Sequence, residues 1–331
     1  MSNIFGEFFQ ISIFGESHGE NLGVVIGGCP SGIGLSEDDF LKDIERRKSG
    51  NPGTTPRKEE DKPKIVSGVY KGKTTGSPIC ILFENTDANS SDYDKLKEFP
   101  RPGHADFVAM KKYGGFNDPR GGGHFSGRLT LGLIAAGVIA KKIIRPLNIS
   151  ANVTQAGGIA DINKAIETAI KENDSIGGIV ECVAKNIPLG LGEPFFDSVE
   201  SLISHAVFSI PAIKAIEFGS GFSSASMKGS KHNDSIISAD GKTHTNNAGG
   251  INGGITNGNP LIFRVAVKPT SSIQKIQTTL NLKTGTADKL FVGGRHDVCI
   301  ALRVPVVLES VTAIVFADLM LKEQKIKRIN K

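Results

Sequence analysis

The chain has 331 residues and a mass of 35.1 kDa, enough for a large core in one domain or in two intimately packed halves. Its 39% hydrophobic and 22% charged residues are typical of a soluble globular protein. A net charge of +5, with 6% aromatic residues and no Trp, argues against nucleic acid as a partner. The charge fits an enzyme that handles phosphate or carboxylate groups, and it fits a solvated surface equally well.

The cysteines and the apolar stretches exclude further classes of protein. Cys29, Cys80, Cys182 and Cys299 are widely spaced and form no CxxC pair, so we expect no metal site and a cytoplasmic location. The first ten residues lack the basic segment and the apolar run of a signal peptide. Residues 129–144 are apolar but too short to span a bilayer and carry two lysines, which predicts a buried helix and no membrane partner.

The first half of the chain mixes short strands with helices. Apolar runs predict buried strands at 24–28 and 79–83. Ser36 followed by Asp39 resembles a capping box and predicts a helix as far as Lys48. After Arg128, apolar residues recur at helical spacing until Pro146 ends the helix.

The second half continues in the same way. Asp161 is typical of a helix N-cap, and the segments after it predict a strand, a helix, a strand and a long last helix, at 176–184, 198–208, 261–268 and 306–322. The basic tail at 325–328 is expected to be frayed surface. Because strands and helices do not alternate strictly, we predict an α+β fold over residues 1–331 and not a Rossmann sheet.

Three separated segments place a histidine in a loop. These are Gly15-Glu16-Ser17-His18-Gly19, Arg101-Pro102-Gly103-His104-Ala105-Asp106 and Gly294-Arg295-His296-Asp297. Histidine changes charge near neutral pH, and a loop lets its ring meet a ligand. The accompanying arginines and carboxylates indicate one site, assembled by folding, for a small anionic substrate.

Two glycine-rich runs allow more than one interpretation. Residues 120–128, RGGGHFSGR, precede a helix and could present N–H groups to an anion, or they could be only a turn. Residues 246–254 match neither Walker A nor GxGxxG and indicate either a close approach to a flat ligand or a floppy loop. Residues 268–272, KPTSS, combine a cation with hydroxyls, which suits phosphate but is also common at surfaces.

Taken in order, these segments resemble the chorismate synthase family. GESHG, RPGHAD, RGGGxxSxR, NNAGGxxGG, KPTSS and GRHDxC cover nearly the whole chain. The resemblance implies a lyase of the shikimate pathway that removes phosphate from 5-enolpyruvylshikimate 3-phosphate by anti-1,4-elimination to give chorismate. It also implies reduced FMN as a cofactor, a β-α-β sandwich and a homotetramer. Whether the enzyme reduces its own flavin with NADPH or depends on a separate flavin reductase stays open.

The resemblance also assigns catalytic roles. It implies that His104 protonates or stabilises the leaving phosphate and that His18 acts as an acid toward the reduced flavin. Asp297, with Ser17 and Ser126, is implied to tune a proton relay around flavin N5. A general acid of this kind is typically worth about 10²–10⁴ in rate.

Anion contacts follow from the same resemblance. Arginines supply planar, bidentate donors to dianions and carboxylates. The implied substrate contacts are Arg47, Arg101, Arg128 and Arg295. The implied FMN contacts are Ser126, Gly127, Arg128, Pro211, Ala212, Gly253, Lys268, Pro269, Thr270, Ser271, Ser272 and Arg295. Arg46, next to Arg47 on a helix, is expected to point elsewhere and to be solvated.

The chain departs from the family pattern at three places. His124-Phe125 stands where the family often has Arg-Ser, Gly53 stands near a family arginine, and Pro211 stands where many relatives have Asn. Arg57 or Lys58 could replace the charge missing at Gly53.

Two other function classes remain as alternatives. A phosphate-ester hydrolase would use His and Arg but normally needs a metal cluster or a nucleophile with an adjacent base, and no HxH element occurs. A non-catalytic flavin- or nucleotide-binding module would need the glycine runs but neither His18 nor His104.

Overall fold

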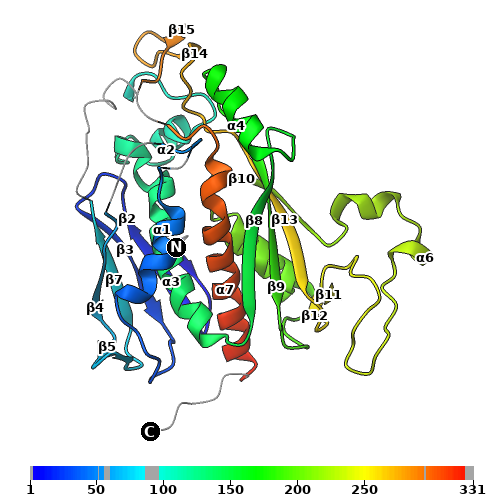
Figure 1. Cartoon of the computed structure of the whole chain (residues 1–331). Coiled ribbons are helices and arrows are strands. Elements are labelled where there is room, and N and C mark those ends of the chain that lie inside the picture. The colour runs from blue at the N-terminus through cyan, green and yellow to red at the C-terminus, as the bar shows by residue number, and fades with distance from the viewer. Residues whose placement is uncertain (1–2, 51, 56–59, 86–96, 294–295, 325–331) are drawn as a thin grey trace.

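A computed structural model describes residues 3–50, 52–55, 60–85, 97–293 and 296–324 of the chain. Two antiparallel sheets face each other across a layer of helices (Figure 1). The first sheet has the order β1 (Ile4–Phe5), β2 (Gln10–Gly15), β3 (Asn21–Gly27), β7 (Ile79–Glu84) and β4 (Pro63–Ser67). The second has the order β10 (Ile213–Phe218), β13 (Leu261–Val267), β9 (Gly178–Lys185) and β8 (Asn148–Ala156).

Two long helices, α3 (Thr130–Ile143) and α7 (Val304–Lys322), form the centre of the helical layer. They pack against each other, α3 against β2, β3 and β7, and α7 against β8 and β9. The two helices cross closely, because a Cβ atom on Gly137 would lie 2.3 Å from the Cβ atom of Ser310. Two shorter helices complete the layer: α1 (Asp38–Arg47) packs on α3 and α7, and α5 (Val199–Val207) packs on α7 and β10.

Alternation along the strands explains why each sheet buries one face. In β3, Leu22, Val24 and Ile26 are fully buried, and Ile79 and Ile81 of the neighbouring β7 are buried with them. The core therefore lies between each sheet and the helices.

Smaller elements surround this frame. The helices are α2 (Asp106–Lys112), α4 (Ile162–Lys171) and α6 (Gly229–His232). The two-stranded pairs are β5 (Val69–Tyr70) with β6 (Lys73–Thr74), β11 (Ile251–Asn252) with β12 (Ile255–Thr256), and β14 (Gln277–Leu280) with β15 (Ala287–Leu290). Single 3-10 turns occur at Arg120–Phe125, Gly127–Leu129, Phe195–Asp197, Gly221–Ser226 and Ile300–Arg303.

The predicted α+β class is confirmed, since every strand pair is antiparallel. The predicted strands and helices are present to within a few residues. Asp161 caps α4 by accepting a hydrogen bond from the Lys164 N–H. At α1 the prediction is half right: Asp39 accepts from the backbone N–H of Ser36, whereas the Ser36 side chain does not cap the helix. The tail at 325–328 lies outside the described residues.

One described helix, Ile300–Lys322, is long and apolar enough to cross a membrane by composition alone. However, 83% of its most apolar window is buried inside the protein. A helix covered on all sides by protein is apolar all round, so α7 is the core helix of the fold.

Candidate active site

Segments from both sheets and the helical layer enclose a cavity of about 550 Å³, a volume typical of small-molecule sites. Its wall brings together most of the residues predicted from the sequence. These are Ser17, Arg47, Arg101, His104, Ser126, Gly127, Arg128, Pro211, Ala212, Lys268, Pro269, Thr270, Ser271, Ser272 and Asp297.

Positive charge dominates this wall. Two carboxylates among the described lining residues, Asp61 and Asp297, face six cations: Arg47, Lys48, Arg101, Arg128, Lys268 and Arg303. Such an excess in a concave site favours a small anion with several negative charges.

Arg101, His104 and Asp106 form a tight cluster in one wall. Asp106 accepts hydrogen bonds from Nε and Nη2 of Arg101 at 2.8 Å each, and its Oδ1 lies 2.5 Å from Nδ1 of His104. Burial alone would raise the pKa of Asp106, but the hydrogen bonds from Arg101 and His104 outweigh it and hold this pKa well below its usual range. Asp106 is therefore an anion at neutral pH. With Nδ1 donating to it, Nε2 is the imidazole nitrogen left for a ligand.

The KPTSS segment completes this wall. Nη1 of Arg101 donates to Ser272 Oγ at 3.2 Å, and both Lys268 Nζ and Ser271 Oγ donate to the carbonyl of Gly103. The side chains are thus fixed before any ligand arrives, which reduces the entropy cost of binding.

His18 occupies a different environment from His104. Its side chain is buried beneath the glycine loop and does not line the cavity, whereas the neighbouring Ser17 does. A Cβ atom on Gly121 would lie 2.5 Å from Cδ2 of His18, and one on Gly122 would lie 3.3 Å from Cε1 of His104. Gly121 and Gly122 also have positive φ angles of 59° and 81°. The glycine loop is therefore required both by its backbone and by the two rings packed beneath it.

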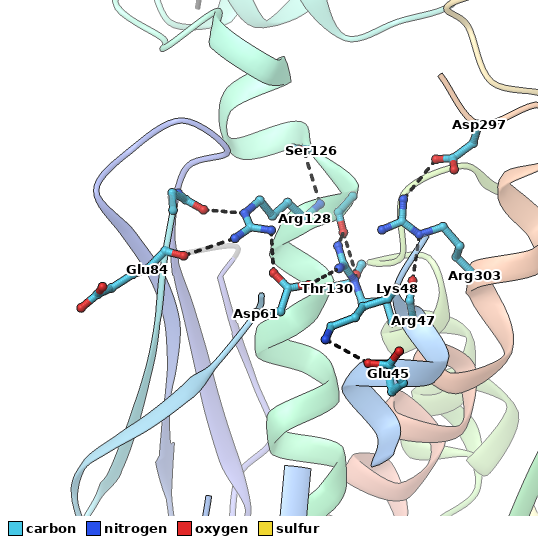
Figure 2. Close-up of polar contacts among 12 residues, drawn as sticks. Glu45, Arg47, Lys48, Asp61, Glu84, Ser126, Arg128, Thr130, Asp297 and Arg303 are labelled. Carbon is cyan, nitrogen blue, oxygen red and sulfur yellow. Dashed lines mark hydrogen bonds and ion pairs between the residues drawn. The ribbon is translucent and has the colours of Figure 1, made fainter. Parts of the chain in front are cut away.

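Asp297 also lines the cavity and is fixed by two hydrogen bonds. Its Oδ1 accepts from the Thr55 N–H at 2.8 Å. Its Oδ2 accepts from Arg303 Nη1 at 3.2 Å (Figure 2). Nε of Arg303 also donates to the carbonyl of Arg47, so the start of α7 is tied to the end of α1.

Arg47 and Arg128 converge on the buried carboxylate of Asp61 (Figure 2). Nη1 of Arg128 lies 2.8 Å from Oδ1 of Asp61, and Nη1 of Arg47 lies 3.4 Å from Oδ2. Burial and the nearby charge of Arg303 together lower the pKa of Arg47 to about 10, although Asp61 and Asp297 oppose them. Arg47 is still a cation at neutral pH.

Two predicted features lie away from the cavity wall, and a third falls outside the described residues. Gly253 lies in the turn between β11 and β12, away from the cavity wall, and Arg295 lies outside the described residues. The run 246–254 is neither floppy nor open to a ligand at its centre: Asp234 accepts from the N–H groups of Asn247 and Ala248, and a Cβ atom on Gly250 would lie 2.5 Å from the carbonyl oxygen of Pro260.

The departures from the family pattern have partial structural explanations. His124 and Phe125 line the cavity, so this departure borders the site. At Gly53, φ is 87° and a Cβ atom would lie 2.9 Å from Ile166, so the position has no room for an arginine. Pro211 lines the cavity, and Arg57 and Lys58 lie outside the described residues.

Sequence reasoning missed Asp61, Asp106 and Arg303. Only Asp106 had a local signal, since it stands two residues after His104. Arg46 points away from the cavity and is 39% exposed, as expected, and it also pairs with buried Glu309 through two hydrogen bonds of 2.7 Å. Among the described residues, no group of three or more His, Cys, Asp or Glu side chains could hold a metal ion.

Comparison with known proteins identifies the family of the chain. The family model for chorismate synthase matches residues 9–321. A chorismate synthase of Chitinophaga pinensis is 64% identical over 330 residues, covering 99% of each chain, and one of Dehalococcoides mccartyi is 46% identical over 363 residues, covering 100% of each. A solved chorismate synthase crystal structure matches with a TM-score of 0.74 and 26% identity, covering 96% of this chain and 93% of that one.

These relatives place the chain among enzymes, in the class of carbon–oxygen lyases that act on phosphates. The chain belongs to the chorismate synthase family. That family forms chorismate from 5-enolpyruvylshikimate 3-phosphate in the shikimate pathway and needs reduced flavin.

Proposed function

We propose that the cavity is where this chain eliminates phosphate from 5-enolpyruvylshikimate 3-phosphate, with reduced FMN bound beside the substrate. One observation supports this most: six cations line the cavity around His104, which Asp106 holds in one orientation. The substrate carries a phosphate and carboxylates, the groups that such a wall attracts.

The residues present fit the flavin. KPTSS offers hydroxyls and an ammonium group, and Gly127 has open space where a side chain would stand. The FMN would be held by Ser126, Gly127, Arg128, Pro211, Ala212, residues 268–272 and Arg295. Gly253 is also a predicted FMN contact, although it does not line the cavity. Bound reduced flavin supplies an electron-rich ring beside the substrate in a reaction with no net oxidation or reduction.

His104 serves the leaving group in this proposal. As the carbon–oxygen bond breaks, the departing phosphate gains negative charge. Because the Nδ1 proton is donated to Asp106, cationic His104 carries its second proton at Nε2, where it lowers the barrier as a hydrogen-bond donor or acid. Arg47, Arg101, Arg128 and Arg295 bind and orient the anionic groups.

The remaining catalytic residues act around the flavin. Ser17, Ser126 and Asp297 line the cavity and pass a proton near flavin N5. His18 acts from beneath the glycine loop, as an acid behind Ser17. The fold is the β-α-β sandwich of the family, in a cytoplasmic homotetramer, and the reducing equivalents come from NADPH or from a separate flavin reductase.

The test is phosphate release from the substrate under anaerobic conditions. Photoreduced FMN should support turnover and oxidised FMN should not. Equal rates with both forms would remove the flavin from the reaction and favour a hydrolase. Flavin binding without any phosphate release would favour a non-catalytic flavin-binding module.

A further inference from the structure

The carboxylate of Asp61 is an unexpected neighbour for the anion-binding arginines. It lies in the cavity wall and is buried, with 2% of its side chain exposed. It faces the two arginines with which an anionic ligand would be expected to pair. Its backbone has a φ angle of 50°, which L-residues rarely adopt, so the surrounding structure holds it in place.

Each arginine is anchored independently of Asp61. Arg47 donates from Nε to Thr130 Oγ1 at 2.9 Å and from Nη2 to the Gly127 carbonyl at 3.1 Å (Figure 2). Arg128 donates from Nε to Asn85 Oδ1 at 2.5 Å and from Nη2 to the Glu84 carbonyl at 3.4 Å. Neutralising Asp61 would therefore leave both guanidinium groups in position.

The charges near Asp61 are nearly balanced. Arg47, Arg128 and Arg303 provide three positive charges, and Asp61 and Asp297 provide two negative ones. Without the charge of Asp61, two positive charges in excess would face the cavity. A buried excess of this kind attracts any small anion.

We propose that Asp61 is an internal counter-ion that limits the affinity of Arg47 and Arg128 for free phosphate. A ligand that makes contacts along the whole cavity wall still binds, because Lys268 and the Arg101 cluster contribute to its affinity. A lone phosphate ion gains little at a pair that is already half neutralised. Where the proposed reaction operates, the same feature would help the product phosphate to leave, but the counter-ion role itself does not depend on that reaction.

The test uses inorganic phosphate and the full-length protein without flavin. Calorimetric titration should show that Asp61→Asn binds phosphate about tenfold more tightly than the parent, because a repelling charge has been removed beside two cations. Glu217→Gln is the matched control: Glu217 also pairs with an arginine, Arg264, at 2.8 Å, but outside the cavity, and this variant should bind phosphate as the parent does.

Two further measurements keep the result decisive. The melting temperature of Asp61→Asn should rise with phosphate concentration more steeply than that of the parent. Asp61→Glu retains the charge, so it should bind phosphate no more tightly than the parent does. A folded Asp61→Asn protein with unchanged or weaker phosphate affinity would overturn the proposal. If Asp61→Asn does not fold, an Asp61→Glu protein that binds phosphate more tightly than the parent would overturn it.

Discussion

Arg46 and Arg47 are neighbours on α1, and each pairs with a buried carboxylate, yet the two pairs have different surroundings. Arg46 reaches Glu309 of α7, in the layer between the helices and the second sheet. Arg47 reaches Asp61 in the wall of the cavity. Successive residues of a helix point in directions about 100° apart, so the last turn of α1 places Arg46 at the interface with α7 and Arg47 in the cavity wall.

The carboxylate of Glu309 is buried and is surrounded by protein groups. Besides Arg46, the carboxylate accepts from Lys141 Nζ at 3.1 Å and from the Ala151 N–H at 3.0 Å. It therefore joins α1, α3, α7 and β8, and it does not line the cavity. The Asp61 cluster instead borders space where a ligand can bind. The same ion-pair chemistry thus stabilises the fold in one place and prepares an anion site in the other.

The largest expected effect lies on the cavity side of this comparison. His104→Ala should lower kcat by about 10²–10⁴, the usual contribution of a positioned acid, with little loss of stability because the ring is partly exposed. Anaerobic turnover and thermal melting measure the two quantities. His205→Ala is a control outside the cavity wall and should keep parental turnover. Near-parental turnover of His104→Ala would show that this histidine is structural.

His18→Ala provides a contrast within the same experiment. Because His18 is buried beneath Gly121, its removal leaves a void and should lower stability, which His104→Ala should not do. If His18 also serves the flavin, the absorbance of bound reduced flavin should change its dependence on pH in this variant alone.

Local patterns predicted the elements well and the charge pairs badly. α3 and α7 have long apolar runs, and Asp161 and Ser198 cap their helices as local chemistry predicts. β8 was missed because its exposed positions are polar and two of its three buried positions, Ala151 and Ala156, are small. Arg46 and Glu309 are 263 residues apart in the sequence. Arg47 and Asp61 are 14 residues apart and are brought together by tertiary packing. No local pattern encodes such partners, so the motif residues were found and their counter-ions were not.

The next largest effect concerns the Glu309 cluster and its contribution to stability. Glu309→Gln should lower the free energy of unfolding by about 2–4 kcal/mol, somewhat below the range for a fully buried pair because Arg46 is 39% exposed. Urea denaturation measures this change. Turnover of the folded protein should stay at the parental value, since Glu309 does not border the cavity.

Glu181→Gln is the matched control for this prediction. Glu181 lies 3.9 Å from Arg264 and is about one-third exposed, so its loss should change stability by less than about 1 kcal/mol. A Glu309→Gln protein that keeps its stability but loses turnover would reverse the roles assigned to the two clusters.

The smallest effect is the dependence of stability on acid pH. Asp106 has a pKa that Arg101 and His104 hold below the value of about 3.9 expected in the unfolded chain. The unfolded state therefore binds a proton more readily, so the stability that Asp106 contributes is present above about pH 5 and is lost as the pH falls below about 4. The Asp106→Asn variant has no carboxyl group at this position, so it lacks this pH-dependent contribution to stability. Urea midpoints measured between pH 7 and pH 3 should fall less steeply for this variant than for the parent. Glu309→Gln should also make the urea midpoint less dependent on pH, because the pKa of Glu309 is lowered by Arg46 and Lys141.

The two variants differ in turnover: at pH 7 only Asp106→Asn should slow phosphate release, because only Asp106 orients His104. Parallel acid curves for parent and Asp106→Asn would show that this carboxylate gains nothing from its partners on folding.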